Sequence, residues 1–246
     1  MKKEILIGLI ILSILNVVHG SGAKDMIKMG DKYAQKGDYE SAMKAYNEAL
    51  VLDPKDAEAA YKIGWAHNRM ALNSTGETKT YHFNEASNIL ARAIELDNKN
   101  PLAHIELARS LLFSGLAKDN WDSYTLALRI KEELDIASKL DNKQPDLYFL
   151  LGLWHRYVSK KPYLWRRPLG LGEASKESEL YNLNKAFELA PNRIDILFEL
   201  GKTILSKGDT LSSKKAFQKI ESLEPIDPYE RMLKNEANSI MSKLQR

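Results

Sequence analysis

The sequence contains no cysteine, and this absence limits both its chemistry and the ways in which it can be stabilised. A chain without cysteine forms no disulfide, has no thiol chemistry and carries no cysteine-linked lipid anchor. Glycine and proline are also few, 13 and 8 of 246 residues, whereas 44% of the residues are hydrophobic. That composition is typical of an ordered chain and excludes a largely disordered one. We therefore expect the fold to be stabilised by a packed core alone.

An excess of charge of one sign is missing as well. The chain has 36 lysines and arginines against 33 acidic residues, a net charge of +3, and no long block of like charge. A dedicated nucleic-acid binder would carry a basic stripe. We therefore expect no nucleic-acid partner.

Catalytic and metal-binding patterns are absent too. The histidines are His19, His67, His82, His104 and His155, and none belongs to a His-Glu-x-x-His motif or a close helical pair. His67 and His155 occupy the repeat position that Tyr33 fills, which favours a packing role. Gly170-x-Gly172 lacks the sequence of a phosphate-binding loop. We expect a non-enzymatic protein with no catalytic residue, metal or cofactor.

The N-terminus has the features of a secretory signal peptide. Lys2 and Lys3 precede the apolar run Ile5–Val18, and small residues surround Gly20, after which we expect cleavage. The run is shorter than the roughly 20 residues that span a bilayer. We expect an exported protein, periplasmic or secreted, with an uncleaved N-terminal membrane anchor as the alternative.

The rest of the chain is repetitive. Positions for glycine or another small residue recur at Gly30, Gly64, Ala108, Gly152 and Gly201, and each unit closes on a turn: Asp53-Pro54, Asp97-Asn98, Asp141-Asn142, Ala190-Pro191 and Glu224-Pro225. The spacing of 34 residues, or 34 with insertions of 10 or 15, resembles the tetratricopeptide (TPR) repeat. This resemblance implies an all-α, right-handed TPR-type solenoid of about five helix pairs with a C-terminal capping helix. The expected boundaries are 1–20 for the signal peptide, 23–56, 57–100, 101–144, 145–193 and 194–227 for the repeats, and 228–246 for the cap.

The second half allows a narrower comparison. The segments Leu151–Tyr157, Arg167–Ser175 and Ala186–Pro191 resemble bacterial relatives of the regulator of microtubule dynamics proteins, and the likeness extends over Pro145–Leu244. The resemblance implies an all-helical interaction domain. It implies no microtubule role, since an exported protein of bacterial type would not meet microtubules.

In a TPR solenoid the first helix of each pair lines the concave face, where residues three or four apart point the same way. This places a partner-binding surface on Tyr61, Trp65, Asn68, Arg69, Arg109, Leu112, Phe113, Phe149, Leu153, Arg156, Tyr157, Phe198 and Lys202. Aromatic residues between arginines suit an extended peptide or acidic groups. Trp65 and Phe149 could equally pack against the insertions, whereas we favour binding for Arg69 and Arg109. The first repeat carries Ile27 and Asp31 where carboxylate-clamp TPR proteins carry lysine and asparagine, which argues against clamp-type capture of a chain terminus.

The longest insertion contains a second candidate, Tyr163–Arg167. A tryptophan beside two arginines could contact an anionic lipid surface or a partner. Trp165 could equally pack onto the fourth repeat, and we favour that packed arrangement.

Together these features predict an exported adaptor or scaffold that binds a protein or peptide segment on its concave face. The alternative is a periplasmic ligand-handling or transporter-accessory TPR subunit that binds a small anion or a substrate-binding protein. A pocket enclosed by the insertions would favour the alternative.

Overall fold

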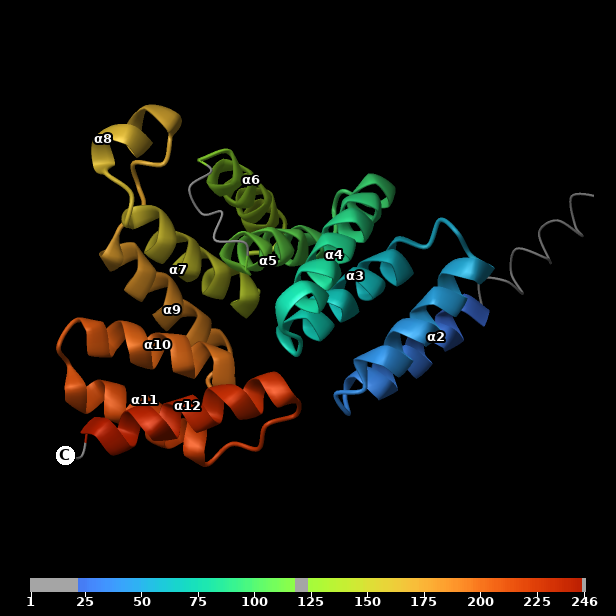
Figure 1. Ribbon diagram of the computed structural model, residues 1–246. Helices are drawn as coiled ribbons and strands as arrows, with labels where there is room; N and C mark the ends of the chain where they lie inside the picture. Colours follow the sequence, from blue (N-terminus) through green and yellow to red (C-terminus); the bar gives the residue numbers. More distant parts are fainter. Residues whose placement is uncertain (1–21, 118–123, 245–246) are drawn as a thin grey trace, which may run out of the picture.

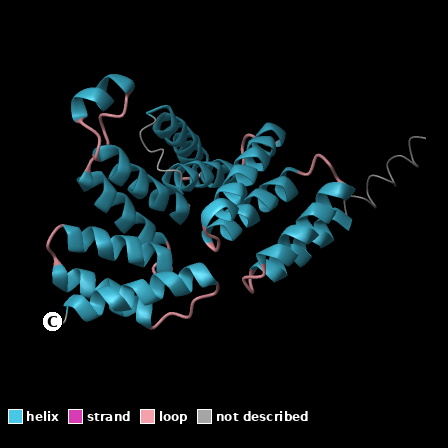
Figure 2. Cartoon of the chain, in the orientation of Figure 1, coloured by secondary structure: helices cyan, strands magenta, loops and turns pink. Residues whose placement is uncertain are grey.

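The computed structural model describes residues 22–117 and 124–244, which are helical apart from their turns and connectors (Figures 1 and 2). The signal peptide expected at 1–20 lies outside the described residues. A first helix over residues 22–34 is followed by α2 (Tyr39–Leu52), α3 (Ala57–Leu72), α4 (Gly76–Leu96), α5 (Pro101–Ala117), α6 (Tyr124–Leu140), α7 (Pro145–Ser159), α8 (Tyr163–Arg166), the 3-10 turn η1 (Arg167–Leu169), α9 (Lys176–Leu189), α10 (Ile194–Ser206), α11 (Thr210–Glu221) and α12 (Pro228–Leu244). The all-α prediction is confirmed.

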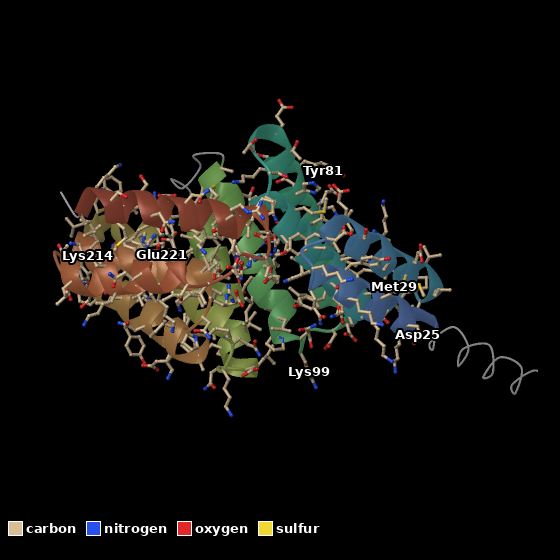
Figure 3. The ribbon with its side chains drawn as sticks, turned by 90° about the horizontal axis from the view of Figure 1, so that it is seen from below. Asp25, Met29, Tyr81, Lys99, Lys214 and Glu221 are labelled. Atoms are coloured by element: carbon tan, nitrogen blue, oxygen red, sulfur yellow. The ribbon has the colours of Figure 1, made fainter. Side chains whose placement is uncertain are left out.

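The helices pack as consecutive pairs. The pairs α3–α4, α5–α6, α7–α9 and α10–α11 are stacked in chain order, and α12 packs on α10 and α11. Figure 3 shows Asp25 and Met29 at one end of this array and Lys214 and Glu221 of α11 at the other. Within the parts of the chain that the structure describes, no helix is long and apolar enough to cross a membrane.

Short polar residues begin several of these helices. The side chains of Asp38, Asp56, Ser175 and Asp209 each accept a hydrogen bond from a backbone N–H of the first turn, which compensates donors that have no partner inside the helix. Pro145 stands at the first position of α7, where its missing N–H costs nothing.

Small residues allow the two helices of a pair to approach closely. A Cβ atom on Gly64 would lie 2.4 Å from Cγ of Leu90, so the α3–α4 contact requires glycine at this position. Small residues on the second helices are buried as well: Ala42, Ala49, Ala86, Ala93, Ala137 and Ala186. The core between the pairs therefore has the small-against-large packing that the repeat pattern predicts.

The connector that leads into α12 reaches back to the first two helix pairs. The connector between α11 and α12 reaches the turn that precedes α2, where Tyr39 Oη donates to Asp227 at 2.7 Å. Arg69 Nη2 also donates to Asp227 at 2.7 Å, and the backbone N–H of Tyr229 donates to Asn73 Oδ1 at 2.7 Å. We call these five residues, Tyr39, Arg69, Asn73, Asp227 and Tyr229, the terminal clasp. The clasp therefore ties the connector before α12 to the first two helix pairs.

Candidate functional site

Two adjoining hollows lie on the concave face beside the terminal clasp. The first, of about 280 Å³, is lined by Asp31, Ala34, Gln35, Tyr46, Tyr61, Lys62 and Trp65. The second, of about 290 Å³, is lined by Ala34, Tyr39, Trp65, Arg69, Glu106, Arg109, Asp146, Arg193, Ile226 and Glu230. Since Ala34 and Trp65 belong to both, we treat the two hollows as one surface, the concave groove.

Aromatic side chains from two helix pairs form the apolar part of the groove. The rings of Trp65 and Tyr39 meet edge to face with centroids 5.6 Å apart, and the Arg69 guanidinium lies 5.5 Å from the Tyr39 ring centre. Tyr61 stands one helical turn before Trp65, and burial raises the pKa of its hydroxyl well above the usual value. These contacts fix the aromatic rings in place before any partner arrives.

Arg69 is neutralised from within the chain. Its partner Asp227 has a fully buried side chain, which also accepts the Tyr39 hydroxyl. Burial alone would raise the pKa of Asp227, but the Arg69 guanidinium and the hydrogen bonds hold it below its usual value. The carboxylate therefore stays charged and holds Arg69 in position.

Arg109 lies deeper, in a network that joins the three helices α5, α7 and α10. Its Nε donates to both carboxylate oxygens of Glu106 at 3.1 Å, and its Nη2 pairs with Asp146. Arg193 bridges Asp146, at 2.7 Å, to Asp195. Burial would raise the pKa of Asp146, but the two guanidiniums hold it far below its ordinary range.

The charges around the groove favour a cation. Four cations face six carboxylates there: Lys62, Arg69, Arg109 and Arg193 against Asp31, Glu106, Asp146, Asp195, Asp227 and Glu230. Glu230 accepts a hydrogen bond from the Ile226 backbone at 3.0 Å and has no cation within 4 Å among the described residues. Burial raises the pKa of its carboxyl above the usual value.

A second, basic cleft lies between α7, α9 and α10. It has a volume of about 380 Å³ and is lined by Arg156, Tyr157, Ser159, Lys160, Lys176, Glu179, Lys202, Thr203, Ser206 and Lys207. Arg156 is held by Glu179 at 2.7 Å, by Glu199, and by Thr203 Oγ1 at 2.8 Å. Lys160 and Lys176 have no carboxylate within 4 Å in the described parts of the chain.

The residues expected on the concave face fall into three groups. Tyr61, Trp65, Arg69 and Arg109 line the concave groove, and Arg156, Tyr157 and Lys202 line the basic cleft. Asn68, Leu112, Phe149, Leu153 and Phe198 are buried, and Phe113 is partly buried and stacks on Phe83. The packing interpretation thus applies to Phe149, which is only 1% exposed, whereas Trp65 keeps a surface in both hollows.

The sequence did not reveal several residues that build the groove. Tyr39 is the first residue of α2, Asp227 lies in the connector before α12, and Glu230 lies in the first turn of α12. Asp146 and Asp195 each stand in the first turn of a helix, where an acidic residue is ordinarily explained by the helix dipole. The pairing of Asp146 with Arg109 and Arg193 was therefore not predictable from local sequence.

The Trp165 expectation is wrong. Trp165 is 70% exposed instead of packed on the fourth repeat, and Arg166 is the buried side chain of that segment.

The histidines do not converge on one site. His67 and His82 share a hydrogen bond at 2.9 Å between their Nδ1 atoms, and His104 pairs with Glu133 at 2.6 Å. Among the described residues no group of histidine, aspartate and glutamate side chains could hold a metal ion.

Solved TPR structures share this arrangement of helices. A thermophilic TPR protein of Thermus thermophilus matches with a TM-score of 0.63 and 17% identity, over 88% of this chain and 99% of that one. PilF of Pseudomonas aeruginosa matches with a TM-score of 0.56 and 13% identity, over 92% of this chain and 88% of that one. MamA of Desulfovibrio magneticus RS-1 matches with a TM-score of 0.50 and 16% identity, over 88% of this chain and 97% of that one. These similarities support the TPR-type fold.

No curated protein matches the chain significantly in sequence. The family model described as regulator of microtubule dynamics protein 1-3 matches residues 26–245, a longer stretch than the second half in which the sequence motifs lie. The protein is therefore a TPR-type helical repeat protein that belongs to the regulator of microtubule dynamics protein 1-3 family.

Proposed function

We propose that this protein is an exported, non-enzymatic adaptor that binds an extended protein segment in the concave groove. The observation that carries the proposal is the pair of hollows on either side of Trp65. Solenoid proteins use their concave surfaces for binding, and buried aromatic anchors supply much of the energy at such interfaces.

The groove is preorganised for this role. Trp65 is held by the edge of Tyr39, and Tyr39 is in turn held by Asp227 and Arg69. A partner that meets rings already in place avoids part of the ordering cost of binding. One apolar or aromatic side chain of the partner would lie against Trp65.

The charge of the groove determines which charged side chains the partner segment should carry. The arginines that we expected to pair with acidic groups of a partner already pair with carboxylates of the chain itself. The excess of carboxylates and the free side of Glu230 instead favour lysine or arginine. We therefore propose a segment in which a basic residue lies close to an apolar or aromatic one.

Export follows from the apolar segment Ile5–Val18 and the small residues after it. Expression of the full chain in a bacterial host, with N-terminal sequencing of the periplasmic fraction, tests this part. A mature N-terminus at Ser21 is the expected result, and an intact N-terminus in the membrane fraction would support an anchored protein instead.

The groove is tested by selecting peptides from a random displayed library on the mature chain. Recovered peptides should pair a basic with an aromatic residue, and Trp65→Ala should weaken their binding by at least about tenfold, as expected for loss of a central aromatic anchor. Trp165→Ala is the matched control, since that tryptophan lies on the α7–α9 insertion and should not affect binding. Peptides whose binding is unaffected by Trp65→Ala would contradict the groove assignment.

The ligand-handling alternative rests on the basic cleft, where four lysines surround a volume that suits a small molecule. Calorimetric titration with citrate and with pyrophosphate tests it. Binding that is lost in a Lys160→Ala, Lys176→Ala variant and kept in Trp65→Ala would favour the alternative over the peptide adaptor.

A further inference from the structure

The insertion between α7 and α9 exposes an unusual group of apolar side chains. Tyr163, Leu164, Trp165 and Leu169 are 50%, 82%, 70% and 42% exposed, and we call these four residues the insertion tip. They lie on α8 and η1, which project away from the stacked helices at the upper left of Figure 1. Exposed apolar side chains that cluster, instead of lying scattered, usually mark an interaction surface.

The exposure does not come from a loosely held loop. The Arg166 guanidinium is buried under the tip and donates to the backbone carbonyls of Leu171 at 2.8 Å, Gly172 at 2.9 Å and Lys161 at 3.2 Å. Leu171 is in turn buried in the main core. Arg166 therefore ties both ends of the insertion together and holds the tip outward.

Within the insertion segment the charge is of one sign. From Arg156 to Gly172 the chain contains five basic residues and no acidic one. Lys160 and Arg167 are exposed at the base of the tip. An apolar apex with a basic rim has the complementarity that an anionic lipid surface offers.

We propose that the insertion tip docks on an anionic phospholipid surface. Leu164 and Trp165 enter the boundary between headgroups and acyl chains, where tryptophan and tyrosine are enriched, while Lys160 and Arg167 pair with headgroup phosphates. A membrane fits the shape better than a protein partner does. The tip is convex and contains four side chains, whereas a standard protein interface uses about 20 to 30 residues a side. The proposal uses residues outside the concave groove and is independent of the peptide-binding role.

Vesicle co-sedimentation of the mature chain tests the proposal, with phosphatidylcholine vesicles that either contain or lack about 30% phosphatidylglycerol. We expect binding to the anionic vesicles that weakens as salt is raised. The double substitution Leu164→Ala, Trp165→Ala should lower the partition coefficient by about tenfold or more, because two large apolar contacts are lost. Leu211→Ala is the matched control: that side chain is 67% exposed on α11 and should not affect binding.

A second pair of substitutions separates charge from apolar insertion. Lys160→Glu, Arg167→Glu should abolish the preference for anionic vesicles, and since both side chains are exposed, circular dichroism should report an unchanged fold. Equal binding of the native chain and the Leu164→Ala, Trp165→Ala variant would overturn the proposal. If the native chain binds neither kind of vesicle, the lipid-docking proposal is also overturned, and a protein partner becomes the better explanation of the insertion tip.

Discussion

The hydroxyl of Tyr39 donates a hydrogen bond to the carboxylate of Asp227 at 2.7 Å, across 188 positions of the sequence. In an open solenoid each repeat touches only its neighbours. Here the first and second pairs also touch the connector that leads into α12, and Ile226 and Glu230 consequently form one wall of the concave groove. The long-range contact and the wall of the groove thus depend on the same few residues.

Replacing Asp227 tests how much the terminal clasp stabilises the fold. Asp227→Asn keeps the size of the side chain but leaves the partly buried Arg69 guanidinium without a counter-charge, and breaking one side of such a pair costs about 3 kcal/mol. Urea unfolding should show this loss. Glu224→Gln, an exposed residue in the same connector, should change the free energy of unfolding by less than about 0.5 kcal/mol. Equal effects of the two substitutions would contradict a stabilising clasp.

Gly37 allows a steric test of the same contact. Its φ is +76°, and a Cβ atom there would lie 2.5 Å from the carbonyl oxygen of Ile226. Gly170 has a φ of +77° with nothing within 4 Å of its Cβ position, so it is a matched control for backbone strain. Both alanine variants should lose about 1 kcal/mol from the left-handed conformation. Gly37→Ala should lose about 1 to 3 kcal/mol more from the collision, measured by thermal unfolding. If the two variants melt alike, Ile226 does not press on Gly37 in solution.

The helix pairs could be predicted because the repeat pattern is local. A small residue such as Gly64 and its large neighbour Leu90 lie within one helix pair, so their spacing in the sequence reports their contact directly. The spacing also found Tyr61, Trp65 and Arg69, which share one face of α3. It could not separate them from Phe149 and Phe198, because the first helices also pack on one another and bury part of the same face.

Two features depended on contacts that a sequence does not encode locally. Asp146 meets Arg109 from another helix pair, and Asp227 meets Arg69 only because the connector before α12 reaches back to α3. In the insertion, hydrophobicity alone predicts a buried Trp165. The backbone carbonyls of the turn need donors when they are buried, and Arg166 supplies them. The guanidinium therefore takes the inner position and the indole remains outside.

His67 gives the protein a sensitivity to acid. Burial, and then the neighbouring His82, lowers the pKa of His67 to about 4. Between pH 6.5 and 4 the imidazole of His67 is protonated in the unfolded chain and neutral in the folded chain. As the pH is lowered through this range, the free energy of unfolding should therefore decrease by up to about 3 kcal/mol. His67→Asn, which does not titrate, should reduce this slope in urea titrations.

His104 serves as the contrasting control for that experiment. The hydrogen bond to Glu133 raises the pKa of His104, so its stabilisation is present at low pH and is lost as pH rises through the folded value. His104→Asn should therefore cost more stability at pH 5 than at pH 8, the opposite sign to His67→Asn. Parallel pH profiles for the two variants would show that neither histidine controls the acid response.

Arg109 is the test of the buried network beneath the groove. Its side chain is only 4% exposed and faces Glu106 and Asp146. Arg109→Met fills a similar volume but leaves Glu106 without a cation and Asp146 with Arg193 alone, which should cost about 3 kcal/mol at pH 7. Arg109 is one of the two guanidiniums that hold the pKa of Asp146 down, so its loss raises that pKa, and the difference from the native chain should shrink by pH 4.5. Arg129→Met, at an exposed position on α6, should be close to neutral at both pH values. A deficit that stays constant with pH would mean that Arg109 contributes through packing, and the arginine–carboxylate network would then not be what fixes the floor of the groove.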